Sequence, residues 1–102
     1  MNEIAFTKTA ANLLKEIADG DIRHTIIEKA EGLRRDPEKQ GKALLYTLKG
    51  LRSIPAAGRC RIIYQVEKAE MRVIVLVVGK RKEGDKADVY ELTKKLLRHG
   101  LI

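Results

Sequence analysis

The chain is 102 residues long, enough for one modest core, and we expect residues 1–102 to form a single domain. Its 44% hydrophobic and 34% charged residues are typical of a globular protein in water, and no apolar run approaches the roughly 20 residues of a membrane-spanning helix. One cysteine and two histidines without ligand spacing argue against a disulfide framework or a zinc site, so we expect no metal and no cofactor. The N-terminus lacks a secretory pattern, which makes a cytoplasmic location the expectation.

The formal net charge of +7 is unevenly distributed along the chain. Residues 1–48 hold eight Lys and Arg against eight Asp and Glu, whereas residues 49–102 hold thirteen against six. The whole excess therefore lies in the C-terminal half. An excess confined to part of a small domain predicts a face that binds a polyanion, and a generic basic surface is the alternative.

The first part of the chain predicts a strand followed by two helices. Residues 2–6 form a short alternating segment, and Thr7 is a suitable N-cap for a helix over residues 8–18. After a glycine, apolar residues recur at three- and four-residue spacing from Asp21 to an Asp-Pro pair, which predicts a second helix. The two helices should form an antiparallel hairpin that covers one face of a sheet.

The middle of the chain changes to a period of two. Residues 43–50 predict a strand, and residues 51–56 predict a second strand or a turn that Pro55 confines to an edge or a bend. Residues 59–67 alternate cleanly between an apolar and a mostly polar face. The run at 71–79 is apolar on both faces, which is typical of a central strand.

A terminal helix is expected from about Asp88 until Gly100 ends it. The resulting order is β-α-α-β-β-β-α. It predicts an α+β domain in which an N-terminal helical hairpin packs on a small, mostly antiparallel sheet, with a helix at the C-terminus.

Arginines mark each of the three later strands. Arg52 lies on the first of them, Arg59 and Arg61 share the polar face of the next, and Arg81 follows the last. If these strands pair in sequence order, Arg52, Arg61 and Arg81 converge. Converging guanidiniums repel one another unless an anion lies between them, and arginine binds phosphate in a bidentate fork. The alternative is that each arginine pairs with a nearby carboxylate such as Glu67 or Glu83.

Four short motifs resemble a known family. They are LKG at residues 48–50, GRCRIIYQVE at 58–67, VGKR at 78–81, and a DVY tyrosine, Tyr90, ahead of the terminal helix. In these motifs, and in the helical hairpin before the sheet, the chain resembles RelE-like toxins of type II toxin–antitoxin systems, within the RelE/ParE superfamily. The resemblance covers essentially the whole chain, and it implies the RelE/ParE-like fold.

The resemblance also implies an activity and a catalytic site. Members are metal-independent endoribonucleases that enter the ribosomal A site and cut messenger RNA, using the RNA's own 2′-hydroxyl as nucleophile. Carried over by motif, Arg61 and Arg81 match the phosphate-stabilising arginines, and Tyr90 matches the C-terminal tyrosine. Arg52 falls where a lysine is common, and Ile54 replaces a second basic residue. The implied partners are a cognate antitoxin, the ribosome and messenger RNA, with no membrane.

The remaining cations of the C-terminal half are candidates for holding the RNA backbone. Arg59, Lys80, Lys82 and Lys86 lie at the same end of the predicted sheet. Tyr90 is expected to stack on a base or transfer a proton, and its alternative role is to pack the terminal helix onto the sheet.

Two other functions remain open from the sequence. ParE-type toxins of the same superfamily inhibit DNA gyrase and are not nucleases. A non-catalytic nucleic-acid-binding member would satisfy the basic half of the chain alone. The arginine and tyrosine matches favour the nuclease.

Overall fold

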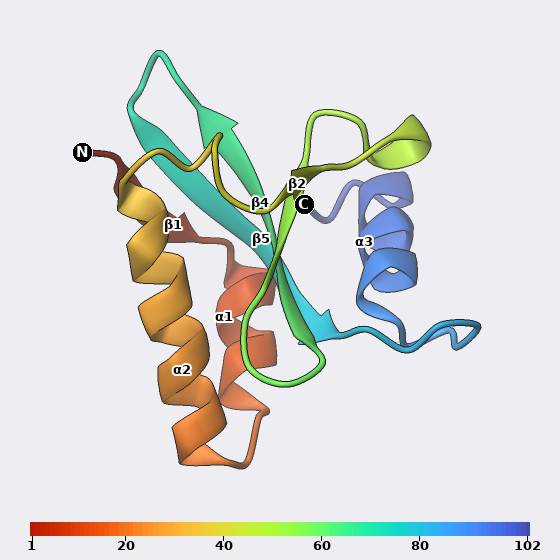
Figure 1. Cartoon of the computed structure of the whole chain (residues 1–102). Helices are drawn as coiled ribbons and strands as arrows, with labels where there is room; N and C mark the ends of the chain where they lie inside the picture. The colour runs from red at the N-terminus through yellow and green to blue at the C-terminus, as the bar shows by residue number, and fades with distance from the viewer.

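Three helices pack on one mixed sheet in the computed structural model, which describes all of residues 1–102 (Figure 1). The five strands are β1 (Glu3–Phe6), β2 (Lys42–Ala43), β3 (Arg52–Pro55), β4 (Cys60–Glu67) and β5 (Arg72–Lys80). Their order in the sheet is β1-β5-β4-β3-β2. Only β1 pairs in parallel, with β5, and the other pairs are antiparallel. The predicted α+β class and mostly antiparallel sheet are confirmed.

The two N-terminal helices begin at side-chain caps. Thr7 accepts a hydrogen bond from the Ala10 N–H at 3.0 Å and starts α1 (Lys8–Lys15), as predicted. α2 (Gly20–Glu31) begins one residue earlier than predicted because Asp19 is its cap and accepts from the Asp21 N–H at 2.9 Å. The expected extension of the first helix to residue 18 is wrong, since α1 ends at Lys15. No helix in the fold combines the length and the apolar character needed to cross a bilayer.

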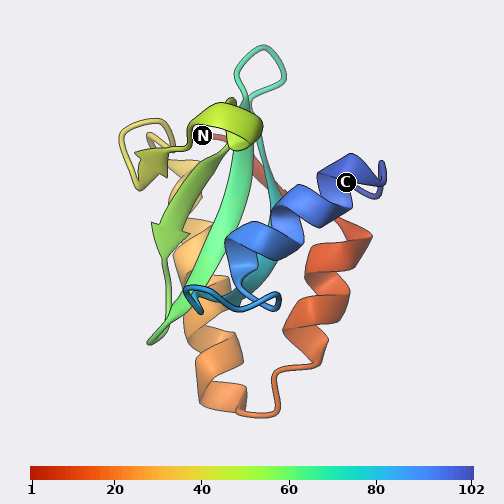
Figure 2. The same ribbon diagram turned by 90° about the vertical axis from the view of Figure 1, so that its right-hand side faces the viewer.

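The helices divide between the two faces of the sheet. α1 and α2 cover one face, where Ile26 and Ala30 of α2 pack with Ile62 and Tyr64 of β4 in the larger core. α3 (Val89–Arg98) covers the other face, where its Val89 packs in a smaller core (Figure 2). The predicted helical hairpin on one face and the terminal helix are therefore present, with the sheet between them.

An extra residue interrupts the pairing of β4 with β5. Ile63 pairs with Val77 and Tyr64 with Val75, so Leu76 has no partner in β4 and forms a β-bulge. Its carbonyl oxygen instead accepts a hydrogen bond from the Thr7 hydroxyl at 2.9 Å. Leu76 and Val77 both join the smaller core, so the side chains beyond the bulge alternate in the opposite sense.

The strand predicted over residues 43–50 is wrong. Only β2 forms there, and a 3-10 turn (Tyr46–Leu48) follows it. The reason is packing: Leu48 and Leu51 are both buried in the smaller core, and their three-residue spacing fits a turn better than a strand. β3 ends at Pro55. β2 pairs only with Arg52 and Ser53, so Pro55, which has no N–H to donate, lies beyond the part of β3 that has a neighbour on both sides.

Tyr64 fastens the loop after α2 to the sheet. Its ring is fully buried, and its hydroxyl lies 2.8 Å from the carbonyl oxygen of Pro37 and 2.9 Å from that of Gln40. The Arg52 guanidinium donates to the same Gln40 oxygen at 2.9 Å and to the Tyr64 hydroxyl at 3.4 Å. Burial raises the pKa of Tyr64 above its ordinary value of 10.0, because the phenolate is poorly solvated there.

We predict that Tyr64→Phe lowers the free energy of unfolding by about 1–2 kcal/mol, because it takes a hydrogen-bond donor from buried carbonyls. Urea denaturation at neutral pH measures the loss. A folded-state pKa above 10.0 means that the tyrosine's contribution is complete below pH 10 and falls as the pH rises further. The difference between the two proteins should therefore shrink above pH 10, and equal stability at neutral pH would contradict the role given to the hydroxyl.

Candidate active site

Three arginines gather on the α3 face of the sheet, where β4 begins and β5 ends. Arg61 pairs with Gly79 across the strands, and the Arg81 N–H donates to the Arg59 carbonyl at 2.9 Å. Together they line a hollow of about 560 Å³ that contains no hydrophobic side chain. The other lining residues are Lys82, Glu83 and Asp85. The bulge at Leu76 is what brings Arg81 to this face.

Arg61 carries an unsatisfied polar atom. Its side chain is half-buried on β4, and its Nε is buried without any hydrogen-bond partner. Buried polar atoms in folded proteins nearly always have a partner, and an exception calls for an explanation. An anion in the hollow between Arg59, Arg61 and Arg81 would bind the outer nitrogens of this guanidinium, and it would reach the Nε only if the side chain shifted.

Arg81 is paired in the free protein. Its guanidinium forms an ion pair with Glu83, and the two side chains are 44% and 77% exposed. The alternative predicted for the arginines, pairing with a carboxylate, thus holds for Arg81 and not for Arg61. An ion pair this exposed contributes little to stability, about 0–1 kcal/mol, so a bound phosphate can replace the carboxylate at low cost.

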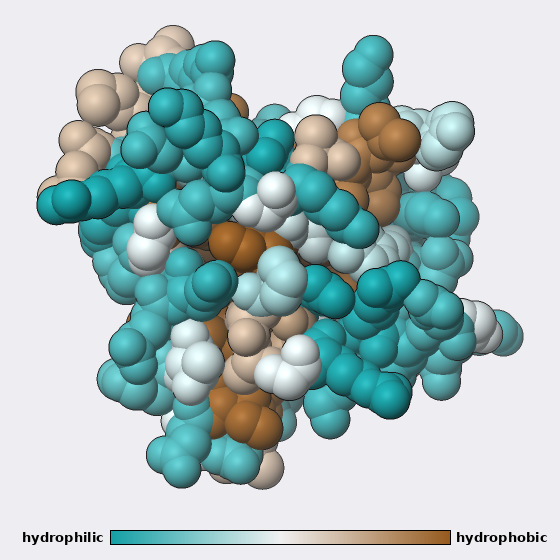
Figure 3. Space-filling view, in the orientation of Figure 1, coloured by the Kyte–Doolittle hydropathy of each residue, from teal (hydrophilic) through white to brown (hydrophobic).

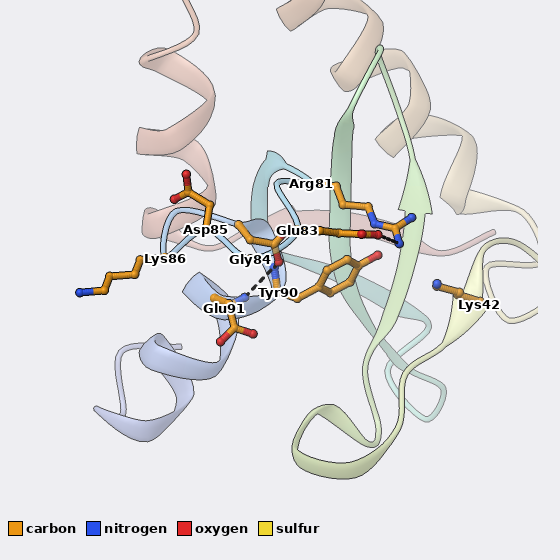
Figure 4. A pocket seen from close by; sticks show the side chains of 9 residues that line it. Lys42, Arg81, Glu83, Gly84, Asp85, Lys86, Tyr90 and Glu91 are labelled. Carbon is orange, nitrogen blue, oxygen red and sulfur yellow. Dashed lines mark hydrogen bonds and ion pairs between the residues drawn. The ribbon is translucent and has the colours of Figure 1, made fainter.

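Tyr90 lies in the first turn of α3 and faces Arg81. Its hydroxyl is 2.9 Å from the hydroxyl oxygen of Ser53 on β3, and its ring packs on the smaller core. Arg81, Glu83 and Tyr90 point toward one another in a second hollow of about 450 Å³, which Lys42 also lines (Figure 4). The position of the tyrosine is thus fixed at both its ring and its hydroxyl.

Asp88 joins the segment that follows Arg81 to the helical turn that carries Tyr90. One of its carboxylate oxygens accepts from the Tyr90 N–H at 2.9 Å as the N-cap of α3, and the other accepts from the Lys82 N–H at 2.5 Å. The side chain is buried. It therefore joins the end of β5 to the start of α3, and it fixes the loop that separates Arg81 from Tyr90.

Three predicted site residues lie elsewhere than expected. Arg52 does not converge with Arg61 and Arg81, because Ile54 enters the larger core and Arg52, two residues before it, shares that face of β3. Lys80 pairs with Cys60 and lies on the helical-hairpin side of the sheet. Lys86 lines the second hollow, but its side chain points away from Arg81 and Tyr90 (Figure 4).

Three residues of the site were not predicted. Ser53 faces away from its neighbour Ile54, which is buried in the larger core, and so it lies on the α3 face of the sheet. β2 pairs Lys42 with Ser53, which places Lys42 on the same face. Neither position carries a local sequence signal. Asp88 does carry one, since an Asp followed three residues later by Glu91 is typical of a helix N-terminus.

Comparison with known proteins identifies the family. A model of the ParE toxin of type II toxin–antitoxin systems matches residues 4–84, which include the helical hairpin, all of the sheet except Glu3, and both Arg61 and Arg81. The chain belongs to the RelE/ParE superfamily of type II toxins. A search of curated protein sequences gives no match to this toxin.

Solved structures agree with this assignment. The toxin is similar to a chain of the RelBE toxin–antitoxin complex of Mycobacterium tuberculosis, with 30% identity over 78% of this chain and 98% of that one, and a TM-score of 0.71. The isolated Escherichia coli RelE toxin (19% identity, 95% and 99% coverage, TM-score 0.70) shares the fold. So does a chain of the Pseudomonas aeruginosa chromosomal ParDE system (15% identity, 80% and 98% coverage, TM-score 0.65).

Proposed function

We propose that the toxin is a metal-independent endoribonuclease that cleaves messenger RNA on the ribosome and thereby inhibits translation. The observation that carries the proposal is that Arg61, whose buried Nε has no partner, lines a hollow together with two further arginines. A half-buried guanidinium without a carboxylate, next to one held only by an exposed ion pair, is suited to an oligoanion that arrives from solution.

The reaction proposed is attack of a ribose 2′-oxygen on the adjacent 3′-phosphodiester. A bond forms from the 2′-oxygen to phosphorus and the bond from phosphorus to the 5′-oxygen breaks, leaving a 2′,3′-cyclic phosphate and a 5′-hydroxyl. The 2′-hydroxyl loses a proton and the 5′-oxygen gains one. Negative charge grows on the non-bridging oxygens in the transition state, and Arg61 and Arg81 would stabilise it there as fixed donors.

Binding of the scissile phosphate requires Arg81 to exchange its partner. Glu83 holds this guanidinium in the free toxin, so the phosphate and the carboxylate compete for it. Arg59 and Lys82 line the same hollow and would hold the backbone on one side of the scissile phosphate, while Lys42 lines the adjoining hollow beside Tyr90. Arg52 and Lys80 take no part, because they lie on the opposite face of the sheet.

Tyr90 has two candidate roles in this reaction. Its ring could stack on a base next to the scissile phosphate, or its hydroxyl could transfer a proton. The hydrogen bond with Ser53 favours a positioned ring, because it engages the hydroxyl in the free protein. Packing of α3 on the smaller core also depends on this ring, so part of its role is structural.

Inhibition of DNA gyrase is the second candidate function, because the matching family model is that of ParE toxins. The hollow of arginines favours the nuclease, since gyrase inhibition calls for no phosphate-binding site in the toxin. Primer extension on messenger RNA from a translation reaction, run beside a gyrase supercoiling assay, separates the two. Cleavage without loss of supercoiling is expected, and the reverse result would replace the nuclease by the gyrase inhibitor.

We also propose that the toxin binds a cognate antitoxin. The Mycobacterium tuberculosis structure that it resembles at 30% identity is a toxin–antitoxin complex. A net charge of +7 favours a partner segment that carries acidic residues. Such a segment would neutralise the exposed cations of the C-terminal half.

We predict that Arg61→Ala and Arg81→Ala each lower the rate of messenger cleavage by about a hundredfold, or roughly 3 kcal/mol in the transition state. Ribosome binding should weaken much less, because the other cations remain. Arg72→Ala is the matched control: Arg72 is similarly exposed and also paired with a glutamate, but it lies at the far end of β5. Equal cleavage rates for all three variants and the wild type would exclude the catalytic assignment.

Tyr90→Phe separates the two roles of the tyrosine. The ring and its packing remain, while the hydroxyl bond to Ser53 is lost. If the ring stacks, we expect cleavage within a few-fold of wild type and little change in stability, because one partly exposed hydrogen bond contributes about 1 kcal/mol. Single-turnover cleavage on ribosomes measures the rate. A loss as large as that of the arginine variants would instead assign proton transfer to Tyr90.

A further inference from the structure

Tyr46 is the most exposed large hydrophobic side chain of the toxin. It is 91% exposed, its neighbour Leu45 is 67% exposed, and its backbone φ is +55°. A left-handed conformation is unfavourable for a bulky side chain such as tyrosine, and residues of this kind concentrate at functional sites. Neither core requires this ring, so its position calls for another explanation.

The turn that presents Tyr46 is held firmly in place. Leu48 and Leu51 anchor it in the smaller core. Backbone hydrogen bonds close it, from the Leu48 N–H to the Leu45 carbonyl and from the Lys49 N–H to the Tyr46 carbonyl, both at 3.1 Å. The ring is therefore displayed by a built turn, and Figure 3 shows apolar surface on the lobe that this segment forms, at the upper right.

A groove of about 410 Å³ joins this turn to the proposed active site. Its lining includes Lys42, Tyr46, Tyr90 and Lys94, together with apolar residues of the turn, and it includes no acidic side chain. Lys42 and Tyr90 also line the hollow beside Arg81, so the two depressions adjoin. Lys94 has an exposed ion pair with Glu91, which a phosphate can replace.

We propose that Tyr46 is a stacking platform for a base of single-stranded RNA, next to the phosphate bound at Arg61 and Arg81. An exposed aromatic ring flanked by lysines is the combination that binds exposed nucleotides, because the ring takes the base and the ammonium groups take the backbone. The inference rests on the proposed function, since it gives that active site its neighbouring nucleotide. Lys42 and Lys94 would neutralise the phosphates on either side.

The chemistry of the groove favours RNA over a protein segment as its occupant. Apolar side chains of the turn line the groove and could take an amphipathic segment, but its two charged lining residues, Lys42 and Lys94, are both cationic and favour a nucleotide chain. The tyrosine ring is open to solvent rather than set in the floor of the groove, which is the presentation that a stacked base requires. The lysines add the positive charge that a nucleotide chain seeks.

The test is the affinity of the toxin for a fluorescent single-stranded 2′-O-methyl RNA oligonucleotide, measured by anisotropy at low salt. This probe cannot be cut by 2′-oxygen attack, so binding is read without cleavage. Tyr46→Ala should weaken binding roughly tenfold, whereas Tyr46→Phe, which keeps the ring, should bind like wild type. Met71→Ala is the matched control, because Met71 is also exposed with a positive φ but lies in the β4–β5 turn. It should leave the affinity unchanged.

Folding is checked by thermal unfolding, and Tyr46→Gly provides a second variant because glycine adopts a φ of +55° without strain. Tyr46→Gly should have a melting temperature no lower than that of wild type, and it should bind the RNA oligonucleotide as weakly as Tyr46→Ala does. Binding of Tyr46→Ala and Tyr46→Gly equal to wild type, or no binding by the wild type, overturns the stacking site. If the Tyr46 variants bind RNA like wild type but co-purify with less antitoxin, the groove is a protein-docking site, and the stacking proposal is overturned. A tyrosine effect on binding without any ribosomal cleavage by the wild type would refute the nuclease and leave the stacking site standing.

Discussion

The β-bulge at Leu76 determines which face of the sheet carries Arg81. Before the bulge, Val73 and Val75 point toward the helical hairpin, and strict alternation would send Arg81 to that same face. The unpaired residue reverses the alternation, so Arg81 emerges on the α3 side with Arg61. The Thr7 hydroxyl satisfies the bulge carbonyl and caps α1 as well, so one side chain ties the bulge to the helical hairpin.

The site combines rigid placement with polar groups left incompletely satisfied. Asp88 holds the loop from Lys82 to the start of α3 with both carboxylate oxygens, which fixes Tyr90 relative to Arg81. Within this frame the Arg61 Nε has no partner, and Arg81 has only an exposed one. In a fold with so fixed a backbone, a phosphate can bind after one side-chain change, the release of Arg81 from Glu83.

The local patterns predicted most of the fold. The cap at Thr7, the alternation of residues 59–67 and the doubly apolar central strand depend on near neighbours, and the structure confirms them. The prediction of a strand over residues 43–50 was wrong because the leucines of this segment alternate imperfectly. Burial of Leu48 in the smaller core decided its conformation instead. Tertiary packing overrode a weak local pattern there.

Prediction of the site depended on knowing which face of the sheet each strand residue occupies. Arg61 and Arg81 were brought together as expected, but the sequence motif carries no sign of the bulge that makes this possible. Arg52 was misplaced because spacing along a strand does not show which side enters the core until Ile54 is known to be buried. Lys42 and Ser53 join Tyr90 only through pairing of distant segments, which no local pattern encodes.

The central claim is that the bulge unites Arg61 and Arg81 into one phosphate-binding site. The most direct test follows the arginine Nε–H signals of the toxin by NMR during titration with a non-cleavable single-stranded oligonucleotide. The signals of Arg61 and Arg81 should shift together with a single dissociation constant, while that of Arg52 on the opposite face stays in place. A joint shift of Arg61 and Arg52, with Arg81 unmoved, would contradict the account.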